Sequence, residues 1–189
     1  MSRIGLSGRR RGALRALALV VLVVLASTGA ITPASAYLPG SKHLVLQNNW
    51  SWRCLDADRT ANGANGAKVQ IWDCNSDWQQ QWVVTYLPDG WMKIQNGWSG
   101  NCLDADLNTA NSGSTKVQLW ACNGSIQQQW TSGAGWSGTD VLKSRLNGNI
   151  LTVNWWEPGG NGTDVTLVGE YAGNHQYKGA QEWFVSSVD

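Results

Sequence analysis

The sequence predicts an all-β domain built from three copies of one unit of about 48 residues. The first observation behind this prediction is a set of motifs that recur at a constant spacing, which is typical of repeat architectures. The second is composition, because the chain has 22 Gly and 13 Trp but one Phe. Beyond residue 36 it has no long apolar helical stripe. This composition is typical of short strands separated by glycine and asparagine turns.

The N-terminal residues 1–36 have the three parts of a secretory signal peptide. Five arginines come first, an apolar run of about 11 residues follows, and Ala34-Ser35-Ala36 carries small residues at a peptidase site. The apolar run is too short to span a bilayer, which needs about 20 residues. We therefore predict cleavage before Tyr37 and a secreted mature domain of residues 37–189. The peptide is typical of a Gram-positive bacterium, and both the general and the twin-arginine export routes stay open.

The charge of the mature domain limits the kind of partner that it can bind. The signal peptide holds five of the 14 basic residues and none of the 13 acidic ones, so the mature domain has a formal net charge of −4. A mildly acidic protein without clusters of Lys and Arg argues against nucleic acid or an anionic membrane as partner. The three copies, at about residues 41–88, 89–136 and 137–189, fill the mature domain. No separate catalytic domain is therefore expected.

Each motif of the first copy has a counterpart in the second copy, and the spacing is the same for every pair. The matching segments are Gln47-Asn48 with Gln95-Asn96, Cys54–Asp58 with Cys102–Asp106, Lys68–Trp72 with Lys116–Trp120, Cys74 with Cys122, and Gln79–Trp82 with Gln127–Trp130. The third copy is degenerate and closes at Gln181-Glu182-Trp183, with about five extra residues before this motif.

The order of apolar segments and turns predicts several short strands in each copy. In the first copy an opening apolar segment is followed by strands at Cys54–Asp58, Lys68–Cys74 and Trp82–Tyr86, with a turn at Asn62–Gly66. A unit of this size cannot bury its own apolar face. Three units around a pseudo-threefold axis would close a common core and remove exposed strand edges.

The four cysteines lie at equivalent positions of the first two copies, with the same separation in each. In an exported protein, an even number of cysteines at repeating positions indicates disulfides. Four cysteines allow three connectivities, of which repeat symmetry favours one bridge in each copy, Cys54–Cys74 and Cys102–Cys122. A zinc site is disfavoured because the chain has no CxxC motif and only two histidines. We expect no metal and no cofactor.

Alternation of side chains along two predicted strands places a polar patch beside each cysteine pair. If Cys54 lies opposite Cys74 in an antiparallel pair, then Asp56 lies opposite Trp72 on the same face of the sheet. The patch of the first copy comprises Asp56, Asp58, Gln70 and Trp72, and that of the second comprises Asp104, Asp106, Gln118 and Trp120. The opposite, core-facing side of the first copy holds Leu55, Val69 and Ile71.

These residue types suit recognition of a sugar. A carboxylate accepts charge-assisted hydrogen bonds from adjacent hydroxyls, and an amide offers both a donor and an acceptor. An aromatic face packs on the apolar C–H side of a pyranose ring. We expect Asp56 and Asp104 to be functional, whereas Asp58 and Asp106 are expected to initiate turns.

The third copy lacks the patch. Thr152, Thr166 and Val168 stand where the Asp, the Gln and the Trp stand in the other copies. The cysteine pair is replaced by Ile150 and Glu170. The following Trp155-Trp156 is expected to pack over the missing disulfide rather than to form a second kind of aromatic platform. Two sites are therefore expected, in the first and second copies.

The ordered motifs Cys-Leu-Asp, Val-Gln-Ile/Leu-Trp-x-Cys-Asn and Gln-x-Trp resemble those of the ricin B-chain-type β-trefoil lectins, also grouped as carbohydrate-binding module family 13, over residues 40–186. The resemblance implies a β-trefoil with Trp82, Trp130 and Trp183 in the core, and the same two disulfides. It also implies that the Asp anchors sugar hydroxyls, the strand Gln supports it, the Trp stacks on the sugar, and a Gln before the closing motif adds a bond. The implied sugar-binding residues are Asp56, Gln70, Trp72, Gln79, Gln80, Asp104, Gln118, Trp120, Gln127 and Gln128, with the register of the Gln run left open.

The function predicted first is a non-catalytic lectin whose partner is a mono-, oligo- or polysaccharide. Members of the resembled family bind galactosides or plant polysaccharides such as xylan and arabinan, so glycan-bearing surfaces or a separately encoded hydrolase are expected partners. A glycoside hydrolase that pairs Asp56 with Asp58 is disfavoured by the duplicated pair and the absence of a predicted cleft, although such carboxyls need lie only about 5–9.5 Å apart. A trefoil of the protease-inhibitor kind that binds protein would leave the Asp, Gln and Trp sets unexplained.

Overall fold

The computed structural model describes residues 42–136, 138–157, 159–171 and 175–188, which belong to one folded unit, Ser35–Asp189. The predicted signal peptide and its cleavage site lie outside the described residues. The strands are β1 (His43–Asn48), β2 (Cys54–Ala57), β3 (Ala67–Trp72), β4 (Trp82–Tyr86), β5 (Met92–Asn96), β6 (Cys102–Ala105), β7 (Thr115–Trp120), β8 (Gln129–Ala134), β9 (Asp140–Ser144), β10 (Ile150–Val153), β11 (Val165–Val168) and β12 (Trp183–Ser187). The short helical segments are η1 (Arg59–Ala61), η2 (Trp78–Gln80), η3 (Leu107–Thr109), η4 (Ile126–Gln128), α1 (His175–Lys178) and η5 (Gly179–Gln181).

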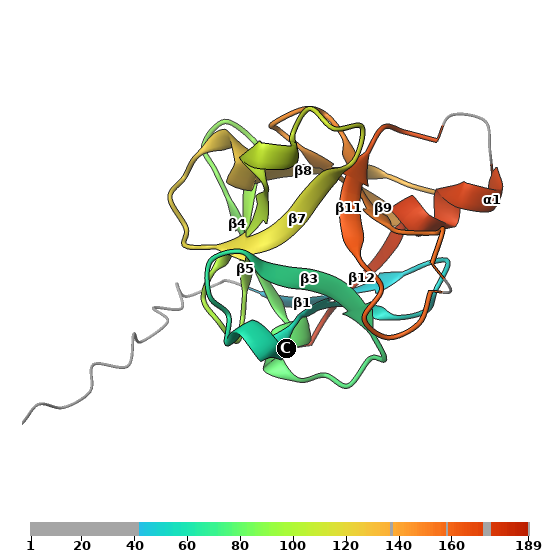
Figure 1. Cartoon of the computed structure of the whole chain (residues 1–189), viewed down its shortest axis with the longest axis horizontal. Coiled ribbons are helices and arrows are strands. Elements are labelled where there is room, and N and C mark those ends of the chain that lie inside the picture. The colour runs from blue at the N-terminus through green and yellow to red at the C-terminus, as the bar shows by residue number, and fades with distance from the viewer. Residues whose placement is uncertain (1–41, 137, 158, 172–174, 189) are drawn as a thin grey trace, which may run out of the picture. The chain divides into compact units, whose positions relative to one another are not determined.

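The strands form a barrel with a triangular cap, which is the β-trefoil arrangement. Strands β1, β4, β5, β8, β9 and β12 pair in a closed antiparallel ring. The three hairpins β2–β3, β6–β7 and β10–β11 cap this ring. Around the pseudo-threefold axis β3, β7 and β11 contact one another pairwise, as Figure 1 shows. The prediction of an all-β fold from three similar units is confirmed, and closure of the ring removes exposed edges.

The core is held by one tryptophan from each repeat, at the start of β4, within β8 and at the start of β12. The indoles of Trp82, Trp130 and Trp183 are fully buried. Each indole N–H donates to a backbone carbonyl of the cap hairpin in its own repeat, at 3.0, 3.0 and 3.1 Å respectively. A buried N–H without a partner would cost about 1–3 kcal/mol. These bonds therefore fix each cap hairpin onto its barrel strand.

Two disulfides join Cys54 to Cys74 and Cys102 to Cys122, each with a Cα–Cα distance of 5.1 Å. The predicted pairing is confirmed, but the predicted strand register is wrong by two residues. Cys54 lies opposite Trp72, and Asp56 lies opposite Gln70. The physical reason is that β3 ends at Trp72, so Cys74 lies beyond the strand and the bridge runs diagonally. Because the shift is even, every side chain keeps its predicted face.

The extra residues of the third repeat lie between β11 and β12, where α1 and η5 are found. Strand β10 begins with the expected apolar pair Ile150-Leu151, and β11 begins two residues after Thr163. In the described part of the chain, no helix is long and apolar enough to cross a membrane.

Candidate functional site

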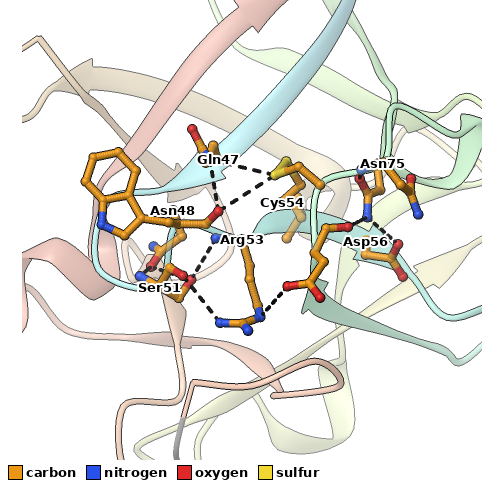
Figure 2. The surroundings of a disulfide bond; sticks show 12 residues. Gln47, Asn48, Ser51, Arg53, Cys54, Asp56 and Asn75 are labelled. Carbon is orange, nitrogen blue, oxygen red and sulfur yellow. Dashed lines mark hydrogen bonds and ion pairs between the residues drawn. A yellow bond between two sulfur atoms is a disulfide. The ribbon is translucent and has the colours of Figure 1, made fainter.

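The carboxylate of Asp56, on β2, is held by glutamine amides from two different elements. Gln70 on β3 donates its Nε2–H to Asp56 Oδ1 at 3.1 Å, and Gln80 in η2 donates to Oδ2 at 3.0 Å. Gln80 also donates to the carbonyl of Asp73 at 3.0 Å and accepts from the Asn75 N–H at 2.9 Å. Figure 2 shows Asp56 and Asn75 close to the disulfide at Cys54. The carboxylate is therefore fixed in orientation before any ligand arrives.

The second repeat reproduces this arrangement from a different stretch of sequence. Asp104 accepts from Gln118 at 3.1 Å and from Gln128 at 3.0 Å. Gln128 also donates to the carbonyl of Ala121 at 3.1 Å and accepts from the Asn123 N–H at 2.8 Å. Corresponding bonds in the two repeats are thus nearly equal in length. Both repeats hold a buried aspartate in the same geometry.

Burial raises the pKa of Asp56 and of Asp104 above the ordinary value of an aspartate. Hydrogen bonds from the neighbouring glutamines oppose this rise in pKa, because amide N–H donors favour the ionised carboxylate. The side chains that act on Asp56 include Gln79 as well as Gln70 and Gln80. Each aspartate is thus a buried acceptor surrounded by donors, which suits it to accept further hydrogen bonds.

An exposed indole stands beside each buried carboxylate. Trp72 is 40% exposed and Trp120 is 39% exposed, although each ends a strand whose other residues are mostly buried. In the second repeat a shallow hollow of about 250 Å³ brings the predicted residues together. Its lining comprises Asp104, Asp106, Leu107, Asn108, Gln118, Trp120 and Gln127. The hollow thus joins an aromatic face, a carboxylate and amides on one open surface.

The structure distinguishes the roles of the two consecutive glutamines in each repeat, whose register the sequence left open. Gln80 and Gln128 are buried, and both ends of each amide already have partners, so they lie beneath the carboxylate as supports. Gln127 lines the hollow of the second repeat, and Gln79 lies close enough to Asp56 to lower the pKa of its carboxyl. Gln79 and Gln127 are therefore the members of the run that lie next to the candidate ligand surface.

Asp58 and Asp106 start short helical segments, as the sequence predicted. Asp58 Oδ1 accepts from the Thr60 N–H at 2.8 Å, and Asp106 Oδ1 accepts from the Asn108 N–H at 3.0 Å. These are N-caps of η1 and η3, a role for which aspartate is strongly preferred. Their carboxylates thus have a structural task of their own.

The third repeat keeps the supporting glutamine but not the carboxylate. Gln181 donates to Thr152 Oγ1 at 3.1 Å and to the carbonyl of Gly169 at 2.9 Å, as Gln80 and Gln128 do with their partners. The Thr152 hydroxyl itself donates to a backbone carbonyl at 2.8 Å and is buried. No anchor for a ligand hydroxyl is left at this position.

The aromatic pair of the third repeat divides into a packed and an exposed member. Trp155 is partly buried against the core and donates its indole N–H to the Tyr171 hydroxyl at 2.8 Å, next to the Glu170 that replaces a cysteine. Trp156 stacks on Trp155 with 3.7 Å between ring centroids but is 79% exposed. Both are expected from the sequence to pack over the missing disulfide; Trp155 packs against the core beside that position, whereas Trp156 is largely exposed.

Sequence reasoning missed one component of each candidate site, a turn that comes from a different repeat. The turn Asn65-Gly66 of the first repeat contacts β7, and the turn Asn161-Gly162 of the third repeat contacts β3. The one available signal was an Asn-Gly pair at equivalent positions of the first and third copies, where the second copy has Gly113-Ser114. Among the described residues no group of His, Cys, Asp and Glu side chains could hold a metal ion.

Comparison with known proteins agrees with this geometry. The family model described as a ricin-type beta-trefoil lectin domain matches residues 42–183. Among solved structures, the designed 3-fold symmetric protein ThreeFoil superposes with a TM-score of 0.67 at 25% identity, over 76% of this chain and 96% of that one. An exo-beta-1,3-galactanase from Clostridium thermocellum gives 0.71 at 25% identity, over 80% of this chain and 31% of that one. The Rhizoctonia solani agglutinin gives 0.64 at 18% identity, over 80% and 97%. Curated protein sequences give no match.

Proposed function

The chain belongs to the family of ricin-type β-trefoil lectins, and from this premise we propose that it is a non-catalytic lectin with two carbohydrate sites. The observation that carries the proposal is the pair of matching carboxylate–amide–indole sets. The first site comprises Asp56, Gln70, Trp72 and Gln79, supported by Gln80, and the second comprises Asp104, Gln118, Trp120 and Gln127, supported by Gln128. No third site is proposed, because Thr152 replaces the carboxylate.

The hydrogen-bond inventory of each carboxylate leaves room for a ligand. An ionised carboxylate has about four acceptor positions. In each site the two glutamine amides use one position on each oxygen. The remaining positions suit two adjacent hydroxyls of a sugar, with the half-exposed indole as the surface for its C–H face. Because the glutamines already fix the carboxylate, little side-chain entropy is lost when a sugar binds.

We propose galactose-type sugars or plant and microbial polysaccharides as the ligand class. The 25% identity with an exo-beta-1,3-galactanase supports a galactose-type ligand. A shallow hollow implies weak affinity at each site. Two sites on one rigid body strengthen binding to a polymeric or clustered glycan by about 100- to 10,000-fold without any new contact. Glycan-bearing surfaces and polysaccharides that a separate hydrolase attacks are therefore the expected partners.

Secretion is part of the same proposal. Two disulfides fit a protein that folds in an oxidising compartment, and the predicted signal peptide would deliver it there. The absence of catalysis is also proposed. A hydrolase would need a second free carboxyl on the other side of the scissile bond, whereas Asp58 and Asp106, the neighbours of Asp56 and Asp104 along the chain, act as helix caps. Release of reducing ends from polysaccharide by the pure protein would contradict this part.

The test is binding of residues 37–189 to immobilised lactose, β-1,3-galactan, xylan and arabinan. We expect the double variant Asp56→Asn, Asp104→Asn to lose binding while its near-ultraviolet circular dichroism is unchanged. The control, Asp89→Asn with Asp140→Asn, removes the same two charges outside both sites and should bind as the unmodified protein does. Full retention of binding by the first double variant would show that the assigned residues do not form the sites.

A further inference from the structure

Each proposed site lies at a seam between two repeats, and the turn on the far side of the seam belongs to the neighbour. In the second site the turn Asn65-Gly66 of the first repeat lies against the end of β7. The Gly66 N–H donates to the Leu119 carbonyl at 2.8 Å, and the Ala121 N–H donates to the Asn65 side-chain oxygen at 2.7 Å. Ala121 is the residue directly after Trp120. The asparagine of one repeat therefore fixes the backbone beside the indole of the next.

The first site shows the same contacts, and here the turn belongs to the third repeat. The Gly162 N–H donates to the Ile71 carbonyl at 2.9 Å, and the Asp73 N–H donates to the Asn161 side-chain oxygen at 2.7 Å. Figure 1 shows β3, β7 and β11 around the axis where these seams meet. Asp73 follows Trp72 directly, so the third repeat holds the strand end that carries the indole of the first site.

The glycine of each turn lies close to the glutamine amide of the site. Gly66 and Gly162 have φ angles of +84° and +88°, a region that other residues rarely adopt. A Cβ added to Gly162 would lie 3.9 Å from Gln70 Oε1 and from the Trp72 ring, and one added to Gly66 would lie 3.9 Å from Gln118 Oε1. The backbone of the turn thus borders the amide of each site, and the positive φ of the turn is what favours glycine there.

The third seam lacks these features. Strand β11 pairs with β7 there, so the neighbouring turn belongs to the second repeat. Gly113 stands at the position of Asn65 and Asn161, so no side chain is available to hold the end of β11. This is also the seam where Thr152, Thr166 and Val168 replace the site residues. The Asn-Gly pair therefore occurs opposite the two proposed sites and is missing opposite the degenerate position.

We propose that Asn161 and Asn65 are positioning residues for the first and second sites respectively, acting from neighbouring repeats. The inference rests on the proposed function, whose sites it completes. It explains why the third repeat, which has lost its own carboxylate, amide, indole and disulfide, has the pair Asn161-Gly162. Its turn completes the first site. Each site consequently needs two repeats, and the third repeat is a working part of a divalent lectin.

The two seams differ in strength. At the first site, Asn161 also accepts from Arg53 Nε at 2.9 Å and donates to Asp73 Oδ2 at 2.9 Å, and Arg53 forms an ion pair with Asp73 at 3.1 Å. At the second site, Asn101 and Ala121 occupy the positions of Arg53 and Asp73, and Asn65 makes the bond to Ala121 described above. Removing the asparagine should therefore weaken the first site more than the second.

The experiment measures each site alone, with the glycan of the four-member panel that the unmodified protein binds most tightly. Asp104→Asn leaves the first site, and Asp56→Asn leaves the second. In the Asp104→Asn protein, Asn161→Ala should weaken binding about 2- to 10-fold, because an indole side chain that is no longer held in place must be ordered again when the sugar binds. In the Asp56→Asn protein the same substitution should leave binding unchanged. Asn65→Ala should show the opposite pattern. Asn111→Ala, in the turn of the second repeat, is the matched control and should affect neither site.

Two further measurements separate positioning from a general loss of structure. Asn65→Asp keeps the acceptor for the Ala121 N–H. When it is added to the Asp56→Asn protein, the affinity for the glycan should stay within about twofold of that of the Asp56→Asn protein if that bond positions the site. In ¹H–¹⁵N spectra without glycan, Asn161→Ala should shift the Trp72 indole signal, and Asn65→Ala that of Trp120. Equal effects of Asn161→Ala on both sites, or none on either, would overturn the inference. If no glycan of the panel binds, the proposed function fails, and the indole shifts still decide whether the seams position these residues.

Discussion

Replacing Asp104 by asparagine should disable the second site while leaving the fold intact. The asparagine oxygen can accept from Gln128, whose amide is held in orientation by Asn123 and Ala121. The new amide then faces Gln118, whose one side-chain hydrogen bond among the described residues is that to Asp104. Gln118 can therefore turn its amide and accept instead. We expect the free energy of unfolding to change by no more than about 1 kcal/mol.

The expected loss of affinity follows from the acceptor positions. Asp104 offers its ligand two charged acceptors, whereas asparagine offers one neutral acceptor and a donor. Charge-assisted hydrogen bonds contribute about 1.5–3 kcal/mol and neutral ones about half of that. With one bond halved and one lost, the site should weaken by about 2.3–4.5 kcal/mol, or roughly 40- to 1,600-fold in Kd.

The assay is a titration of the Asp56→Asn protein, in which the second site alone is active, with and without Asp104→Asn. Tryptophan fluorescence reports binding because the exposed Trp120 lies in the hollow, and urea unfolding checks the fold. A loss in affinity below about threefold, with the fold intact, would show that the carboxylate does not anchor the ligand.

Three further predictions concern acid, the disulfides and the core. Burial raises the pKa of Asp56 and Asp104 above that of an aspartate in the unfolded chain. The folded protein therefore binds protons at these groups more readily than the unfolded chain does. As the pH falls through the folded pKa, their protonation stabilises the fold. Glycan binding should therefore fail on acidification at a higher pH than an exposed aspartate would give, while near-ultraviolet circular dichroism is unchanged; simultaneous loss of both would contradict this. Cys54→Ser with Cys74→Ser opens a loop of 20 residues and should lower the free energy of unfolding in urea by about 3 kcal/mol. An unchanged free energy of unfolding would mean that the loop is already ordered in the unfolded chain. Trp130→Phe removes the donor to the Leu103 carbonyl and should cost about 1–3 kcal/mol in the same assay; a neutral result would mean that this bond does not hold the cap.

The features that the sequence predicted are those that repeat symmetry or side-chain alternation determines. The disulfide pairing followed from equivalent cysteines, and the burial of Leu55, Val69 and Ile71 followed from alternation along two strands. The register was wrong because it assumed that β3 continues to Cys74, whereas the strand ends at Trp72. Spacing alone gives no information on where a strand stops when the polar residues beyond it bond to another repeat.

The parts of the candidate site that could not be predicted depend on tertiary contacts. The order of Gln79 and Gln80 depends on η2, because a helical turn directs adjacent side chains to different sides. The turn at Asn161 lies 88 residues from the Asp73 that it contacts, and no motif links the two. The difference in burial between Trp155 and Trp156 depends on Tyr171, which lies in the insertion of the third repeat.

A crystal structure of the protein soaked with its tightest-binding oligosaccharide tests the central claim most directly. Two sites built on a threefold frame predict sugar density at two positions, beside Asp56 with Trp72 and beside Asp104 with Trp120, in contact with the turns at Gly162 and Gly66. No density is expected beside Thr152. Sugar bound at the third repeat alone, or away from both buried aspartates, would contradict the account.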